Sequence, residues 1–93
     1  MVVGLLTLEL FMSEASSLKS KRRILKSLLD KLKTRFNVSV AEVDKQDKWQ
    51  HSTVGVTCVT NEASHAHQML SAVVKYVETS GNVEILKIQT ELL

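Results

Sequence analysis

The segment from Val38 to Thr60 reads VSVAEVDKQDKWQHSTVGVTCVT. Residues 38–43 and 52–60 alternate between apolar and polar side chains, which predicts two strands. The polar linker 44–51 contains neither proline nor glycine and is too short for a helical crossover. We therefore expect the two strands to form an antiparallel hairpin.

An amphipathic helix is predicted on either side of this hairpin. Leucines recur three, four and seven residues apart in the segment 18–36, and Ser16 or Ser17 is suited to cap its start. Asn61 is the expected cap of a second helix, which ends before Gly81. Each helix has one apolar face, so both should pack against the same layer.

Residues 2–12 and 83–92 supply two further strands, because they are rich in apolar and β-branched side chains. The order β-α-β-β-α-β predicts an α+β, ferredoxin-like sandwich: a four-stranded antiparallel sheet with two helices on one face. If Leu6, Leu8 and Leu10 point to the helices, alternation turns the intervening residues to the open face. These are Val3, Leu5, Thr7, Glu9 and Phe11. Several of them are apolar, so we expect a homodimer formed through the open sheet face or an edge strand.

Composition indicates one small globular domain over residues 1–93. Hydrophobic residues make up 44% and charged residues 24%, which argues against disorder. No apolar run approaches the roughly 20 residues needed to cross a bilayer, and the signal-peptide pattern is missing, so we expect a cytoplasmic protein without membrane contact. The single cysteine, Cys58, excludes an intrachain disulfide and is expected to be a buried thiol.

Charge is distributed unevenly along the chain. Between Lys19 and Arg35 there are eight basic residues and one acidic residue, 8 − 1 = +7, whereas the remainder holds four basic and nine acidic residues, 4 − 9 = −5. The molecule should therefore be strongly dipolar, with its positive end on the first helix.

Most of these basic side chains share one flank of the first helix, beside its apolar face. They are Lys19, Arg22, Arg23, Lys26 and Lys33. A helix about 28 Å long is able to follow several phosphates of a nucleic acid. The alternative is an ordinary solvated face, but the acidic residues that usually intervene at i±4 are largely missing. We include this basic stripe in a candidate nucleic-acid site.

Two further residues complete the candidate site. Lys21 lies within the apolar arc of the first helix, and we expect it either to extend past the helix start into solvent or to line a small anion site. Trp49 is the only tryptophan and lies on the polar hairpin loop. It is suited to stack on a base or anchor a protein interface, unless it folds back onto the sheet edge or a dimer partner.

Four runs of sequence carry a family resemblance. They are SLKSKRR from Ser17, KSLLDKL from Lys26, RFNVSVAEVD from Arg35 and QDKWQ from Gln46. In these runs the chain resembles the YlxP-like family of small bacterial proteins of unassigned function, the domain of unknown function 503. The resemblance covers essentially the whole chain and implies a ferredoxin-like fold. Such proteins are often encoded beside translation initiation and ribosome maturation factors, which implies a link to RNA or the ribosome; the resemblance implies no activity.

Catalytic and metal sites are not predicted. His65 and His67 are two residues apart on a helix and face different ways, so they do not form a chelating pair, and His67 is expected at the edge of the apolar face. Glu9, Glu42 and Asp44 form a carboxylate cluster for Mg²⁺ only if strand registers bring them together on the open face. No phosphate loop, Ser-His-Asp set or Cys-His pair is present, so we predict neither enzyme activity nor a cofactor.

The leading hypothesis is a non-enzymatic accessory protein that contacts structured RNA through the basic stripe. One alternative is a protein-interaction module whose dipolar surface and Trp49 recognise an acidic partner such as a translation factor. A second alternative is a dimeric, small-ligand-binding regulatory domain with its pocket at the dimer junction.

Overall fold

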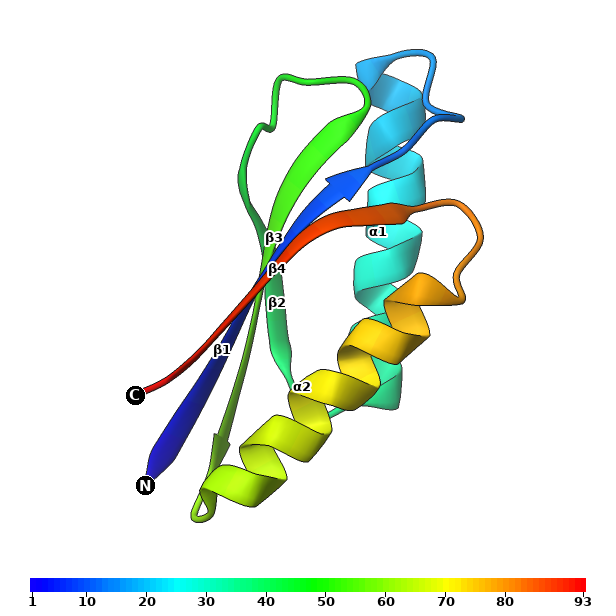
Figure 1. The fold of residues 1–93 in the computed structure, drawn as a ribbon. Coiled ribbons are helices and arrows are strands. Elements are labelled where there is room, and N and C mark those ends of the chain that lie inside the picture. Colours follow the sequence, from blue (N-terminus) through cyan, green and yellow to red (C-terminus); the bar gives the residue numbers. More distant parts are fainter.

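A computed structural model describes all residues of the protein, 1–93. The elements in chain order are β1 (Val2–Phe11), α1 (Leu18–Arg35), β2 (Ser39–Asp44), β3 (His51–Thr60), α2 (Ala63–Glu78) and β4 (Glu84–Leu92). The four strands form one antiparallel sheet in the order β2-β3-β1-β4. Both helices cover the same face of this sheet (Figure 1). The predicted ferredoxin-like α+β fold is confirmed.

The core lies between the sheet and the helices. Leu6, Leu8 and Leu10 on β1 are buried, and the residues between them are partly exposed. The central strand β3 adds Val54 and Val56, which are also buried. The alternation predicted for the first strand is therefore observed, and the face opposite the helices is left uncovered.

Helix α1 begins at the cap expected from the sequence. Ser17 accepts a hydrogen bond from the backbone N–H of Ser20, and the Ser20 side chain accepts one from the backbone N–H of Ser17, which completes a capping box. Leu25, Leu28 and Leu32 on the inner face are buried. The capping box fixes where the helix starts, and the leucines fix its rotation about its own axis. Together the capping box and the leucines fix the direction in which the basic flank of α1 faces.

Helix α2 differs in two details from the prediction. Its N-cap is Glu62 instead of Asn61, because the chain enters the helix one residue later, and no side chain caps the helix start. His67, predicted at the edge of the apolar face, is exposed, because the buried face is narrower than expected: at 100° per residue His67 lies roughly 60° beyond Leu70, the last buried residue on that side. These differences leave the packing of α2 on the sheet unchanged.

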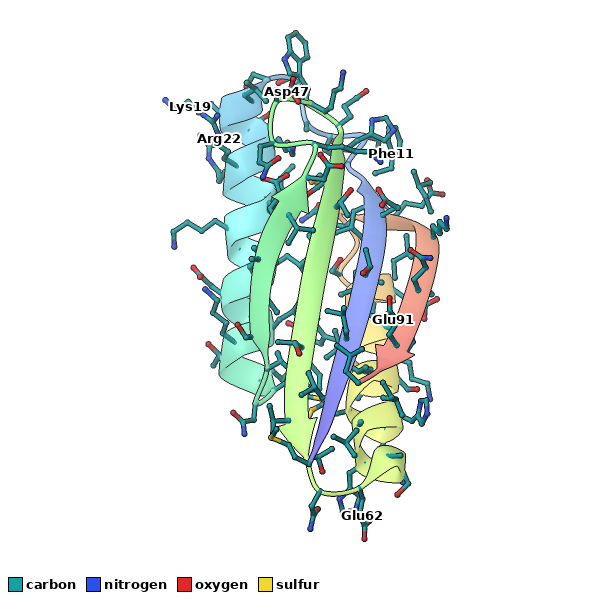
Figure 2. All side chains as sticks on the ribbon, turned by 90° about the vertical axis from the view of Figure 1, so that its left-hand side faces the viewer. Phe11, Lys19, Arg22, Asp47, Glu62 and Glu91 are labelled. Atoms are coloured by element: carbon teal, nitrogen blue, oxygen red, sulfur yellow. The ribbon has the colours of Figure 1, made fainter.

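The two edges of the sheet lie beside different helices. α1 contacts β2 and α2 contacts β4. Pairing of β2 with β3 is interrupted by a bulge between Glu42 and Asp44, where Val43 is the extra residue. β4 forms the other edge, and its pairing with β1 shifts between Glu9 and Leu10. Figure 2 shows the uncovered face with these edges on either side.

Candidate nucleic-acid interface

The outer flank of α1 carries a set of exposed cations, with one acidic residue, Asp30, among them. We call it the basic surface; its members are Lys19, Arg22, Arg23, Lys26 and Lys33, and all five are exposed. Lys19 and Arg22 extend from the N-terminal part of the helix, away from the sheet (Figure 2). The structure therefore brings these five sequence-predicted residues onto one accessible surface.

Only one member of the basic surface has an acidic partner. Lys26 Nζ lies 2.7 Å from Asp30 Oδ2, and the hydrogen bond from Lys26 lowers the pKa of Asp30. Both side chains are more than half exposed, so the ion pair is weak and readily exchanged for another anion. The other four cations have no carboxylate within 4.0 Å. Most of the positive charge of this flank is thus free to attract polyanions.

The remaining cations of α1 lie on a different flank, towards α2. The Arg35 guanidinium lies 4.9 Å from the centre of the Tyr76 ring on α2, close enough for a cation–π contact. Lys31 adjoins Tyr76 in the same region. These two residues are separate from the basic surface, and Lys31 offers a control position of equal charge.

Lys21 has a different role from the one expected. Its side chain is fully buried, and its Nζ lies 2.9 Å from Glu42 Oε2 on β2 and donates a 2.6 Å hydrogen bond to the backbone carbonyl of Lys45. Ser52 donates a further 2.6 Å hydrogen bond to the same Glu42 oxygen. Lys21 neither extends into solvent nor lines an open anion site, because β2 supplies a carboxylate directly opposite. Lys21 is therefore not one of the residues available to contact nucleic acid.

The contact with Lys21 fixes the start of the loop between β2 and β3. Lys45 adopts a left-handed backbone with φ of 62°, which directs its carbonyl to Lys21 while its own side chain reaches the open face of the sheet. There its Nζ lies 2.6 Å from Glu9 Oε1, which also accepts a 2.7 Å hydrogen bond from Thr53. The hydrogen bonds from Lys45 and Thr53 lower the pKa of Glu9. The loop is anchored from both faces of the sheet.

These contacts place the loop beside the N-terminal end of α1. Asp47 lies at the same end of the molecule as Lys19 (Figure 2). Trp49 on this loop is 57% exposed, so it is not folded back into the core. Lys48, also exposed, was not among the sequence candidates; its place on a hairpin loop next to the tryptophan is the signal that points to it. Loop and helix together present cations and one aromatic ring.

No group of three or more potential metal-ligating side chains comes together in the structure. Glu42 does not share the open face with Glu9, because alternation along β2 turns it to the helices with Val40. The condition for a carboxylate cluster, that Glu9, Glu42 and Asp44 share the open face, is therefore not met. His65 lies 3.3 Å from Glu62 on the first turn of α2.

Neither helix combines the length and hydrophobicity that a membrane-crossing segment requires.

Comparison with known families decides the relationship. Residues 3–90 match the family model described as "Protein of unknown function (DUF503)". The chain belongs to this family. It is also 30% identical over 90 residues to the uncharacterized protein YlxP of Bacillus subtilis (strain 168), an alignment that covers 97% of this chain and 98% of YlxP. The resemblance drawn from the sequence is confirmed.

Solved structures support the fold at low sequence identity. The de novo designed protein Foldit4 aligns with a TM-score of 0.56 and 14% identity, covering 98% of this chain and 97% of the design. The de novo designed protein LFR1 1, described as having a ferredoxin fold, aligns with a TM-score of 0.52 and 10% identity over 99% of this chain and 85% of the design. At these identities the similarity concerns the fold alone.

Proposed function

We propose that this member of the DUF503 family is a non-enzymatic accessory protein that binds structured RNA through the basic surface of α1 and the adjoining β2–β3 loop. The observation that carries the proposal is the set of four exposed cations without a carboxylate partner along one helix flank. RNA phosphates are a partner that such a row of cations attracts strongly, because binding releases condensed counterions. Structured RNA holds several phosphates at a fixed spacing from one another.

The dimensions of the surface support this partner. α1 has 18 residues, which corresponds to about 27 Å at 1.5 Å per residue. The basic surface runs from Lys19 to Lys33 along most of that length, so it spans several phosphate spacings. Because the inner face of α1 is packed on the sheet, the helix contacts a backbone from one side and does not enter a groove as an isolated helix.

The loop adds a contact that is not purely electrostatic. Trp49 is more than half exposed and lies on a loop anchored by Lys21 and Glu9 through Lys45. An exposed aromatic ring stacks on an unpaired base, a contact worth about 1–3 kcal/mol. We therefore expect a preference for RNA that offers an unpaired base beside a helix. β3, one of the two central strands, offers Thr53, Gly55 and Thr57 on the open face, so bases are not expected to stack on this strand.

The test is a fluorescence-anisotropy titration of labelled ribosomal RNA fragments with the wild-type protein and two charge-reversal variants. Lys19→Glu/Arg23→Glu changes the basic surface, and Lys31→Glu/Lys75→Glu makes the same change in net charge at exposed positions elsewhere. Affinity should fall at least about tenfold for the first variant and much less for the second. Circular dichroism checks that both variants are folded.

Three results would count against the proposal. Equal losses for the two variants would show that net charge and not this surface governs binding. Equal affinity for RNA, duplex DNA and a polyanion such as heparin would show that the protein has no preference for RNA. Absence of binding at physiological salt, combined with nuclease-resistant capture of an acidic protein, would favour a protein partner for the same surface.

Trp49 gives an independent readout because it is the only tryptophan. Its emission should change on RNA binding, and Trp49→Ala should weaken binding by roughly 5- to 150-fold if a base stacks on it. Unchanged emission at saturating RNA would show that the loop is not part of the interface. The charge-reversal variants would then test the helix contacts alone.

A further inference from the structure

We infer that the exposed edge of β4 is a self-association surface, at which a second copy of this chain adds its own β4 in antiparallel orientation to form a continuous eight-stranded sheet. This goes beyond RNA binding and does not depend on it, because β4 and the basic surface lie at opposite sides of the sheet. In Figure 2 no strand lies on the outer side of β4.

Apolar side chains gather at this edge. Seven large hydrophobic residues of the chain are strongly exposed, and three of them, Leu86, Ile88 and Leu93, lie on β4 or directly after it. Ile88 also lines a groove of about 370 Å³ between β4 and α2, together with Leu70 and Val74. An unpaired strand flanked by exposed apolar groups is a template for pairing with another strand. A partner strand would cover the apolar groups and the free backbone at once.

The charges along β4 are complementary to those of a second β4. Lys87, Gln89 and Glu91 lie opposite Glu9, Thr7 and Leu5 of β1, so all three side chains point to the open face. When two antiparallel copies meet with Gln89 at the two-fold axis, Lys87 of each copy stands opposite Glu91 of the other. Directly opposed side chains on one sheet face are about 5 Å apart, which is within reach of an ion pair. The same register sets Ile88 opposite Thr90 of the second copy.

The β2 edge does not offer this charge complementarity to a second copy. β2 is six residues long, is bulged at Val43 and lies beside α1 with its basic surface. Two copies that met at β2 would bring two rows of unpaired cations together, which opposes association. β4 is also irregular, at Leu86, but it is nine residues long, so the two edges differ in strand length and in the like charges beside β2, which protect that edge. The second copy therefore pairs with β4.

Analytical ultracentrifugation of the wild-type protein and two matched variants tests the proposal. Ile88→Lys inserts a charge at the β4 edge, and Val43→Lys inserts the same charge at the β2 edge; the wild-type side chains are 47% and 55% exposed. The wild-type protein and Val43→Lys should sediment as a species of twice the 10.4 kDa chain mass. Ile88→Lys should raise the dimer dissociation constant at least about tenfold. A monomeric wild-type protein, or a dimer broken by Val43→Lys and not by Ile88→Lys, would overturn the inference.

Charge reversal tests the register. Lys87→Glu and Glu91→Lys each place like charges opposite one another in the homodimer, so each variant alone should be monomeric. Mixed in equal amounts they should form a heterodimer, because every opposed pair then joins Glu with Lys. The double variant Lys87→Glu/Glu91→Lys should dimerise by itself. An unfolded variant would not regain association on mixing, so restored association shows that the single variants are folded and had lost only the pairing. Dimerisation of either single variant by itself would refute this pairing.

Discussion

The buried contact between α1 and β2 gives the sharpest prediction of stability. Lys21 is fully buried and its partner Glu42 retains 17% of its side-chain exposure. Replacing Lys21 with Met keeps most of the apolar stem but leaves Glu42 facing the helices without a counter-ion and removes the donor to the Lys45 carbonyl. Breaking such a pair from one side costs about 3–5 kcal/mol, and the partial exposure of Glu42 places the expected cost near the lower end, about 3 kcal/mol.

Urea unfolding followed by circular dichroism measures this cost. A loss of about 3 kcal/mol is a large fraction of the roughly 5–15 kcal/mol that stabilises a small domain, and it corresponds to a fall in Tm of about 12 °C or more. The control is Lys19→Met, two residues away and exposed, which should change stability by no more than about 0.5 kcal/mol. Lys21→Met/Glu42→Leu should recover about half of the loss, because no charge is then left unpaired. The reasoning is refuted if Lys21→Met costs less than about 1 kcal/mol or matches Lys19→Met.

Two further predictions concern β1. Gly4→Ala would place a Cβ 3.0 Å from the Cys58 sulfur and 3.1 Å from Leu70 Cδ1, both in the core, so it should lower the free energy of unfolding by about 1–3 kcal/mol; wild-type stability in the same urea titration would contradict this packing. Glu9 has a pKa lowered below its usual 4.5, so its contribution to stability is complete above pH 4.5 and is lost as the pH falls through the folded-state pKa. Glu9→Gln should therefore flatten the loss of thermal stability as the pH falls below about 4.5, and parallel pH profiles would disprove the role assigned to its contacts with Lys45 and Thr53.

The fold was predictable because its signals are local. Alternation in 38–43 and 52–60, and the leucine spacing of 18–36, each involve neighbours in sequence, and the short linker leaves only a hairpin between the strands. The exposed flank of α1 followed from the same rotation of 100° per residue. Five of the candidate site residues are exposed on that flank for this reason.

The role of Lys21 was not predictable, although its position in the apolar arc marked it as unusual. Its partner Glu42 lies 21 positions further along the chain on another element, and which face Glu42 occupies depends on the phase of β2. The neighbourhood of Trp49 and the basic surface likewise depends on the contact between Lys21 and Lys45. Tertiary contacts of this kind have no signature in local sequence periodicity.

The salt dependence of RNA binding tests the central claim most directly. The observed association constant of the wild-type protein, of Lys19→Ala/Arg23→Ala and of the control Lys31→Ala/Lys75→Ala is measured for one RNA at several salt concentrations. Each cation that contacts a phosphate contributes close to one unit to the slope of log K against log salt, so the first variant should have a slope about two units shallower than the wild-type protein. The control should keep the wild-type slope. Equal slopes for all three proteins would contradict RNA binding through the basic surface.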